Sequence, residues 1–169
     1  INNLGYCYLR VGDPARARPL LIKASDLLPT SSLVFHNLAL TELQQALNGP
    51  ARRPILLDPI RRAMILDPTS AETCFTAALT FAAASNQESP PPESDSKALA
   101  LQAKKCAQDA IDRGLSPSRL LVLAAMMANS DDAAAIRRLA LSQRTAGEAV
   151  AIEDHLIPPL LPRGRASRM

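Results

Sequence analysis

The sequence predicts an all-α protein made of about three to four antiparallel helix pairs arranged one after another. The first observation is a repeat, because Asn3-Leu4-Gly5 recurs further along the chain as Asn37-Leu38-Ala39. The second is composition: hydrophobic residues make up 47% of the chain but aromatic residues only 3%, so alanine and leucine must fill the core, as in closely packed helices. The third is the presence of 14 prolines, which indicate frequent helix starts and stops.

The first predicted pair occupies residues 1–30. Its first helix runs to about residue 11 and has one apolar stripe at helical spacing. The stripe consists of Ile1, Leu4, Tyr8 and Val11. Gly12 makes the turn, and Asp13 caps the second helix with Pro14 at its first position. The buried edge of that helix is predicted to be Ala17, Leu21, Ala24 and Leu28. Pro19 lies inside it and should kink it, at a cost of up to about 3 kcal/mol.

The second predicted pair occupies residues 31–68 and begins near Ser31-Ser32. Its buried side is predicted to consist of Phe35, Leu38, Ala39 and Leu43. Asp58-Pro59 repeats the cap-and-proline arrangement of Asp13-Pro14. The interval from Pro29 to Pro68 is longer than that from Asn3 to Asn37, so we expect extra residues in the turn between the helices of this unit.

The third predicted pair occupies residues 69–115 and begins near Thr69-Ser70. Its inward residues are predicted to be Cys74, Ala77, Ala78, Phe81, Leu99, Ala103, Cys106 and Ala110. Between its helices, residues 86–96 are rich in proline, serine and acids, which is typical of an exposed loop. Ser96 is expected to cap the return helix and Gly114 to end it.

The last predicted pair occupies residues 116–146, with Ser116-Pro117 as cap and first position and helices over 120–128 and 131–143. A short closing helix over 148–156 completes a predicted domain of residues 1–156. Residues 157–169 form an extended tail rich in proline and arginine.

The first 43 residues carry the clearest family pattern. They contain Leu4-Gly5-x-x-Tyr8, the turn Gly12-Asp13-Pro14, the spacing of Ala17, Leu21 and Ala24, and the closing Pro29. This order resembles the tetratricopeptide repeat (TPR), a helix–turn–helix unit of about 34 residues. The chain departs from the family pattern at Ile1, Ala39 and Glu42, where tryptophan, glycine and tyrosine are usual. The resemblance implies a TPR-like α-solenoid, a right-handed superhelical array. The nearest rival is the pentatricopeptide array, which reads RNA, but the Gly-Asp turn and Pro29 favour the TPR.

In TPR proteins the first helix of each unit lines a concave groove that holds a peptide or helix of a partner protein. The resemblance therefore implies a protein–protein interaction scaffold. The groove residues it implies are Asn3, Tyr6, Arg10, His36, Asn37, Leu40, Gln44, Phe75 and Leu79, with Asn2, Leu9 and Leu43 beside them. The amides of Asn3 and Asn37 are suited to hydrogen-bond the backbone of an extended peptide. Hydrogen bonding between neighbouring helices is the open alternative for both.

Two other functions stay open. The chain begins inside a repeat helix without an initiating methionine, and its richness in alanine and arginine is typical of bacterial TPR arrays. We therefore expect the C-terminal part of a longer bacterial chain, and it could be the regulatory TPR module of a signalling protein such as a serine/threonine kinase. RNA binding would need a basic concave face with stacking aromatics, and nucleic acid is not an expected partner. Self-association through the first helix or through residues 157–163 is a further possibility.

No catalytic motif is found, so we expect neither an enzyme nor a cofactor. His36 and His155 are too far apart to suggest a metal site. The three cysteines, at positions 7, 74 and 106, are expected to be small core residues of a reducing compartment, which indicates the cytoplasm. The net charge of +3 is too mild to indicate nucleic acid, and no apolar run approaches the roughly 18 residues that span a membrane.

Overall fold

The computed structural model is all-α, as the sequence predicts. It describes residues 1–48, 53–87, 95–127 and 130–142. Within these residues lie eight α-helices and one short 3-10 helix. They are α1 (Asn2–Arg10), α2 (Pro14–Leu27), α3 (Ser32–Asn48), α4 (Asp58–Leu66), α5 (Ala71–Ser85), α6 (Ser96–Asp112), η1 (Pro117–Arg119), α7 (Leu120–Met126) and α8 (Ser130–Ser142). The predicted closing helix over 148–156 and the tail over 157–169 lie outside the described residues.

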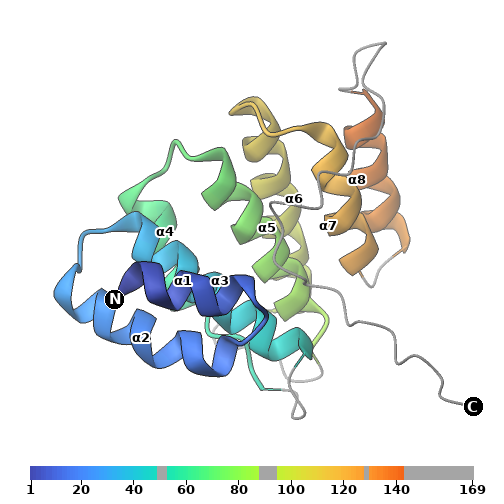
Figure 1. Ribbon diagram of the computed structural model, residues 1–169. Coiled ribbons are helices and arrows are strands. Elements are labelled where there is room, and N and C mark those ends of the chain that lie inside the picture. The colour runs from blue at the N-terminus through green and yellow to red at the C-terminus, as the bar shows by residue number, and fades with distance from the viewer. Residues whose placement is uncertain (49–52, 88–94, 128–129, 143–169) are drawn as a thin grey trace, which may run out of the picture.

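The helices pack mostly in sequential pairs. α1 packs on α2, α3 on α4, α5 on α6 and α7 on α8, and the pairs follow one another along the molecule (Figure 1). The first helices of successive pairs also contact each other, α1 with α3, α3 with α5 and α5 with α7. This arrangement is consistent with a helical repeat. No helix of the described part is both long enough and apolar enough to cross a membrane.

Local sequence signals set most helix ends. Gly12 and Gly114 follow the ends of α1 and α6 with φ of 78° and 90°, a conformation that glycine adopts without strain. At the first of these turns, the N–H of Asp13 donates to the Tyr8 carbonyl, which satisfies a carbonyl left free by the helix end. The Asp13 side chain in turn accepts from the backbone N–H of Arg16 and caps α2, as predicted.

Three other predicted caps are wrong by one residue or lack the bond. α4 already includes Asp58, which makes no capping hydrogen bond, and Leu57 precedes it. α6 is capped by Asp95, whose carboxylate accepts from Lys97, and Ser96 is its first helical residue. Ser116 precedes η1 without a side-chain capping bond, and its hydroxyl lies 2.9 Å from that of Ser118. At α4 and α6 the residue before the predicted cap occupies the N-cap position, whereas at η1 Ser116 occupies it without forming the bond.

Pro19 does not break α2, which runs unbroken from Pro14 to Leu27. Proline removes the hydrogen bond to the carbonyl four residues earlier, here that of Ala15. Both Pro19 and Ala15 are exposed, so water can satisfy that carbonyl. Leu28, predicted to be on the buried edge of α2, is 51% exposed because the helix ends at Leu27.

The main core lies between α5 and its neighbours and consists largely of alanine and leucine. Part of the lengthened second unit also enters this core, although the sequence predicted only a longer turn there. Ile55 and Leu57 are each 2% exposed, so the segment before α4 is more than a loop. The Gln87 amide holds this segment, donating to the Arg53 carbonyl at 2.8 Å and accepting from the Ile55 N–H at 3.1 Å.

Candidate functional site

A cavity of about 500 Å³ runs along the first helices of three successive pairs, and we call it the groove. Each of α1, α3 and α5 contributes residues from the same three positions of the repeat, with a longer interval between α3 and α5 than between α1 and α3. The three sets are Asn2, His36 and Phe75; Asn3, Asn37 and Thr76; and Tyr6, Leu40 and Leu79. The groove is therefore a direct product of the internal repeat.

Seven of the nine groove residues that the resemblance implied line this cavity. They are Asn3, Tyr6, His36, Asn37, Leu40, Phe75 and Leu79. The two others lie elsewhere. Arg10 is exposed at the end of α1 and does not line the cavity, and Gln44 is 1% exposed. The Gln44 amide donates to the Leu9 carbonyl at 3.4 Å, because the last turns of α1 and α3 pack together there. Leu9 is fully buried in one apolar cluster with Leu21 and Leu38, and Leu43 is fully buried in the main core.

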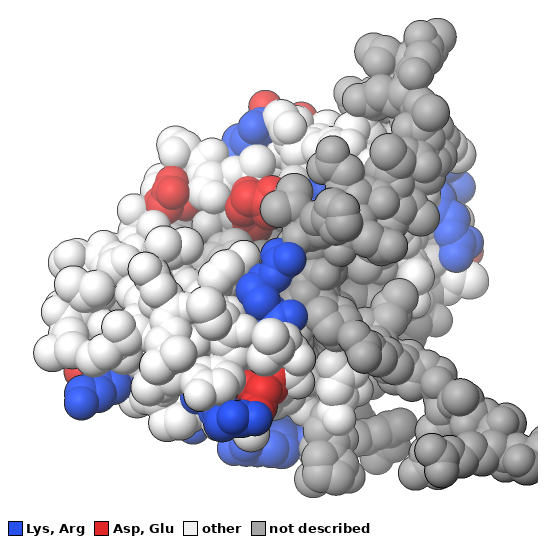
Figure 2. All heavy atoms as spheres, in the orientation of Figure 1, with Lys and Arg blue, Asp and Glu red and all other residues white. Residues whose placement is uncertain are grey.

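The floor of the groove is apolar and its rim is polar. Phe75 and Leu79 are each 1% exposed, and Leu40 is 8% exposed. Tyr6 stands on the rim at 39% exposure, and Asn3 is also exposed. Figure 2 shows that side chains other than Lys, Arg, Asp and Glu cover most of the described surface on this side. Such a lining is typical of sites that hold apolar side chains and orient them with a few polar groups.

The two asparagines of the repeat differ in their surroundings. Asn37 is buried, and its side-chain N–H donates to the Asn2 side-chain oxygen at 3.1 Å, which links α3 to α1. Asn3, at the equivalent position of α1, is exposed on the rim. One side-chain N–H of Asn37 is therefore already used in a hydrogen bond between neighbouring helices. This was the alternative to peptide binding for both asparagines.

His36 lies in the groove between two threonines of α5. Its Nδ1 is 3.4 Å from the Thr73 hydroxyl and its Nε2 is 3.4 Å from the Thr76 hydroxyl. Burial lowers the pKa of His36, while the nearby Glu72 carboxylate raises it and the Arg119 guanidinium lowers it. Both ring nitrogens thus lie within reach of a hydroxyl, and the ring favours its neutral form.

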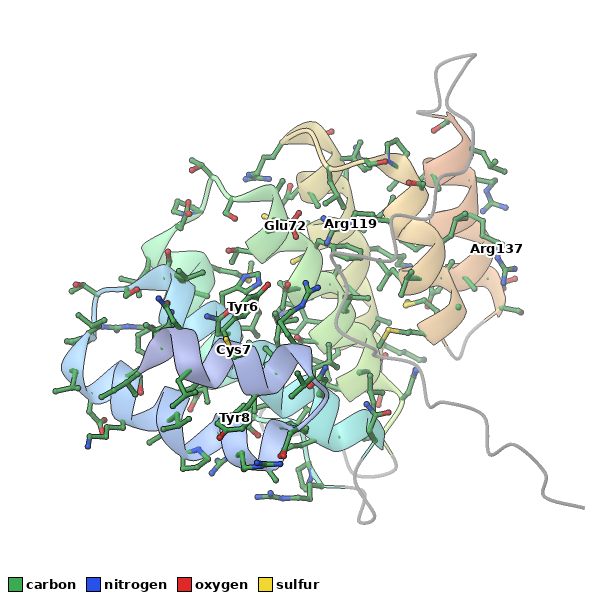
Figure 3. All side chains as sticks on the ribbon, in the orientation of Figure 1. Tyr6, Cys7, Tyr8, Glu72, Arg119 and Arg137 are labelled. Carbon is green, nitrogen blue, oxygen red and sulfur yellow. The ribbon has the colours of Figure 1, made fainter. Side chains whose placement is uncertain are left out.

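Arg119 closes one end of the groove, and it was not among the residues predicted from the sequence. It lies in η1, and both its terminal nitrogens contact the carboxylate of Glu72 on α5; one of these distances is 2.9 Å (Figure 3). Its guanidinium carbon is 4.6 Å from the centre of the Phe75 ring. Its Nε is buried and has no hydrogen-bond partner in the described part of the chain. No local signal marks this residue, because its partners lie in an earlier helix pair, far away in sequence.

The cysteines do not all lie in the core. Cys74 and Cys106 are buried as predicted, and burial raises the pKa of both thiols, that of Cys106 to about 12. Cys7 is exposed, so its predicted core position is wrong, because its side of α1 has no helix packed against it in the described structure. Among the described residues, no cluster of His, Cys, Asp or Glu could hold a metal ion.

Comparison with known proteins identifies no family. No protein-family model, no curated protein and no solved structure matches this chain. The resemblance to the TPR therefore depends on the residues and on the sequential pairing of the helices.

Proposed function

We propose that this chain is a TPR-like interaction scaffold whose groove holds a segment of a partner protein. The observation that carries the proposal is the repeated lining of the groove, in which three helices present the same three positions to one cavity. A segment lying along the groove would meet an equivalent set of side chains at each helix. Binding without catalysis is the role we assign to it.

The lining suggests what such a segment offers. The buried faces of Leu40, Phe75 and Leu79 suit apolar side chains. The exposed amide of Asn3 suits backbone N–H and C=O groups, because an amide both donates and accepts. The unpartnered Nε–H of Arg119 is a further donor at the end of the groove. A segment with apolar anchors and free backbone groups matches this pattern.

The charge of the lining argues against RNA as the ligand. Its charged residues are Asp67, Glu72 and Arg119, and the last two form an ion pair. Nucleic acids bind to surfaces that neutralise phosphates with several lysines or arginines. The lining has an excess of negative charge, so a protein segment fits it better than a phosphate backbone does.

Selection from a library of displayed random peptides would test the proposal even while the partner is unidentified. The parent chain is the bait. Peptides that also bind the Tyr6→Glu variant, which places a charge on the exposed rim, are discarded because they use other surfaces. Leu101→Glu is the matched control, because Leu101 is 65% exposed on α6 and does not line the groove.

We expect peptides that bind the parent and the control but lose at least tenfold in affinity for Tyr6→Glu. Circular dichroism of all three proteins would establish that the variants fold. If every selected peptide bound Tyr6→Glu as tightly as the parent, the groove would not be the binding site.

A further inference from the structure

A second surface lies at the N-terminal end of the helix pairs. Leu4 and Cys7 of α1, together with Val11 directly after it, form an exposed stripe at helical spacing. Leu4 is 52% exposed and Val11 is 76% exposed, and the Cys7 thiol is free. In Figure 1, α1 lies nearest the viewer, and no other helix is drawn over it.

The internal repeat shows what this stripe is equivalent to. The shift that carries Asn3 onto Asn37 carries the stripe onto Leu38, Thr41 and Gln45 of α3. These residues lie where α3 meets the preceding pair. Leu38 belongs to one apolar cluster with Ala17 and Leu21 of α2, and Thr41 is fully buried. The Gln45 side chain donates to the Pro14 carbonyl at the start of α2, at 3.1 Å. The exposed face of α1 is therefore equivalent to the face of α3 that packs against α2.

The two faces differ in chemistry. On α3, Glu42 forms an ion pair with Arg18 of α2, with 2.7 Å between the side-chain nitrogen and oxygen. The equivalent residue on α1 is Tyr8, whose ring is covered by Arg16 of its own pair at 4.9 Å. Val11 stands in the place of Gln45. The face of α1 therefore lacks the polar groups that hold α2 on α3 and is mostly apolar, with the Arg16 guanidinium over Tyr8 at its edge.

We propose that this face of α1 binds an amphipathic helix of a partner molecule that resembles α2. Such a helix carries small and leucine side chains at positions i, i+4 and i+7, as α2 does with Ala17, Leu21 and Ala24. In the described part of a second copy of this chain, that stripe is already buried against its own α1 and α3, so the copy has no free helix of this kind to offer. Because the face is mostly apolar, the binding varies little with salt concentration.

The proposal does not depend on the function of the groove, and Cys7 offers a reporter for it. The probe is a duplicate of residues 1–34, with its own Cys7→Ser, fused in front of Ile1. Because the duplicate has the length of one repeat, it brings the duplicated α2 next to α1, and the fusion raises its effective concentration into the millimolar range. The measurement is the rate at which a maleimide labels the original Cys7, since Cys74 and Cys106 are buried.

We expect at least tenfold slower labelling of Cys7 in the fusion than in the parent, together with a higher melting temperature. A fusion whose duplicate carries Leu21→Glu is the matched control and should label at the parent rate. If the fusion without Leu21→Glu labelled Cys7 at the parent rate, the proposal would be overturned. Such a rate would mean that the duplicated α2 does not cover the face of α1. Light scattering of the parent tests whether a second copy of the chain covers this face instead. A dimer that Val11→Glu abolishes would show that a second copy covers this face, which would also overturn it.

Discussion

The guanidinium of Arg119 stacks on the ring of Phe75, with 4.6 Å between the guanidinium carbon and the ring centre. Through this contact, the start of the fourth helix pair lies on the floor of the groove. The ion pair of Arg119 with Glu72 keeps the guanidinium over the ring. One residue therefore links the stability of the fourth pair to the shape of the candidate site.

We predict that Arg119→Ala lowers the free energy of unfolding by about 0.5–2 kcal/mol, the sum of two contributions. A cation–π contact contributes about 0.5–1 kcal/mol. The ion pair adds at most about 1 kcal/mol, because the Glu72 side chain is 55% exposed and solvent screens it. Glu72→Gln is the comparison, since it removes the charge and leaves the ring contact. Urea denaturation measures both, and an equal loss in the two variants would show that the ring contact contributes nothing.

We next predict that Gly5→Ala destabilises the protein although alanine favours helix. A Cβ atom on Gly5 would lie 2.7 Å from Cγ of Leu21, a fully buried side chain. The gain in helix propensity is about 1 kcal/mol, and such crowding costs about 1–3 kcal/mol. Leu21→Ala removes the crowding, so in that background Gly5→Ala should become stabilising. Thermal unfolding of the four proteins of this cycle would measure the coupling, and additive effects would contradict the close contact.

The sequence predicted those features that depend on neighbours along the chain. The Gly12-Asp13-Pro14 turn has the predicted structure because backbone conformation, capping and proline placement are decided within a few residues. Most of the groove lining followed from the resemblance to the TPR, and it extends over three helices because a repeat places equivalent positions on one face.

Features that depend on distant neighbours were not predictable. Apolar spacing places Cys7 and Cys74 alike on a helix, but only the packing of other helices decides that one is exposed and the other buried. Gln44 has a polar side chain, yet it lies in the interface between α1 and α3. Arg119 meets Glu72 only once the third and fourth pairs have packed together.

Gln44 gives a third prediction, that Gln44→Met raises the free energy of unfolding by about 1 kcal/mol. The side-chain oxygen of Gln44 is buried without a hydrogen-bond partner in the described part of the chain, which is costly. The Leu9 carbonyl loses the Gln44 donor but keeps the Gly12 N–H at 3.1 Å. Gln45→Met is the control, because it removes the bond to Pro14 and should give no gain. A loss of stability in Gln44→Met by urea denaturation would refute the argument.

The final prediction concerns pH and His36. Burial holds the pKa of His36 below its ordinary value of about 6.5, so the unfolded chain takes up a proton that the folded protein resists. The unfolded state then binds more protons, and stability falls as the pH is lowered from about 7 toward the folded pKa, whereas it stays level above. The slope contributed by His36 cannot exceed about 1.4 kcal/mol per pH unit, the limit for one proton.

Free energies of unfolding at several pH values between about 7.5 and 5.5 would measure this effect as the difference between the parent and His36→Gln. Contributions of other titrating groups, including His155, are common to both proteins and cancel in the difference. We expect the stability of the parent relative to His36→Gln to fall as the pH falls, because only the parent carries the protonation penalty. Parallel curves would mean that His36 accepts a proton equally well in the folded and unfolded states, and that its position between Thr73 and Thr76 does not favour the neutral ring.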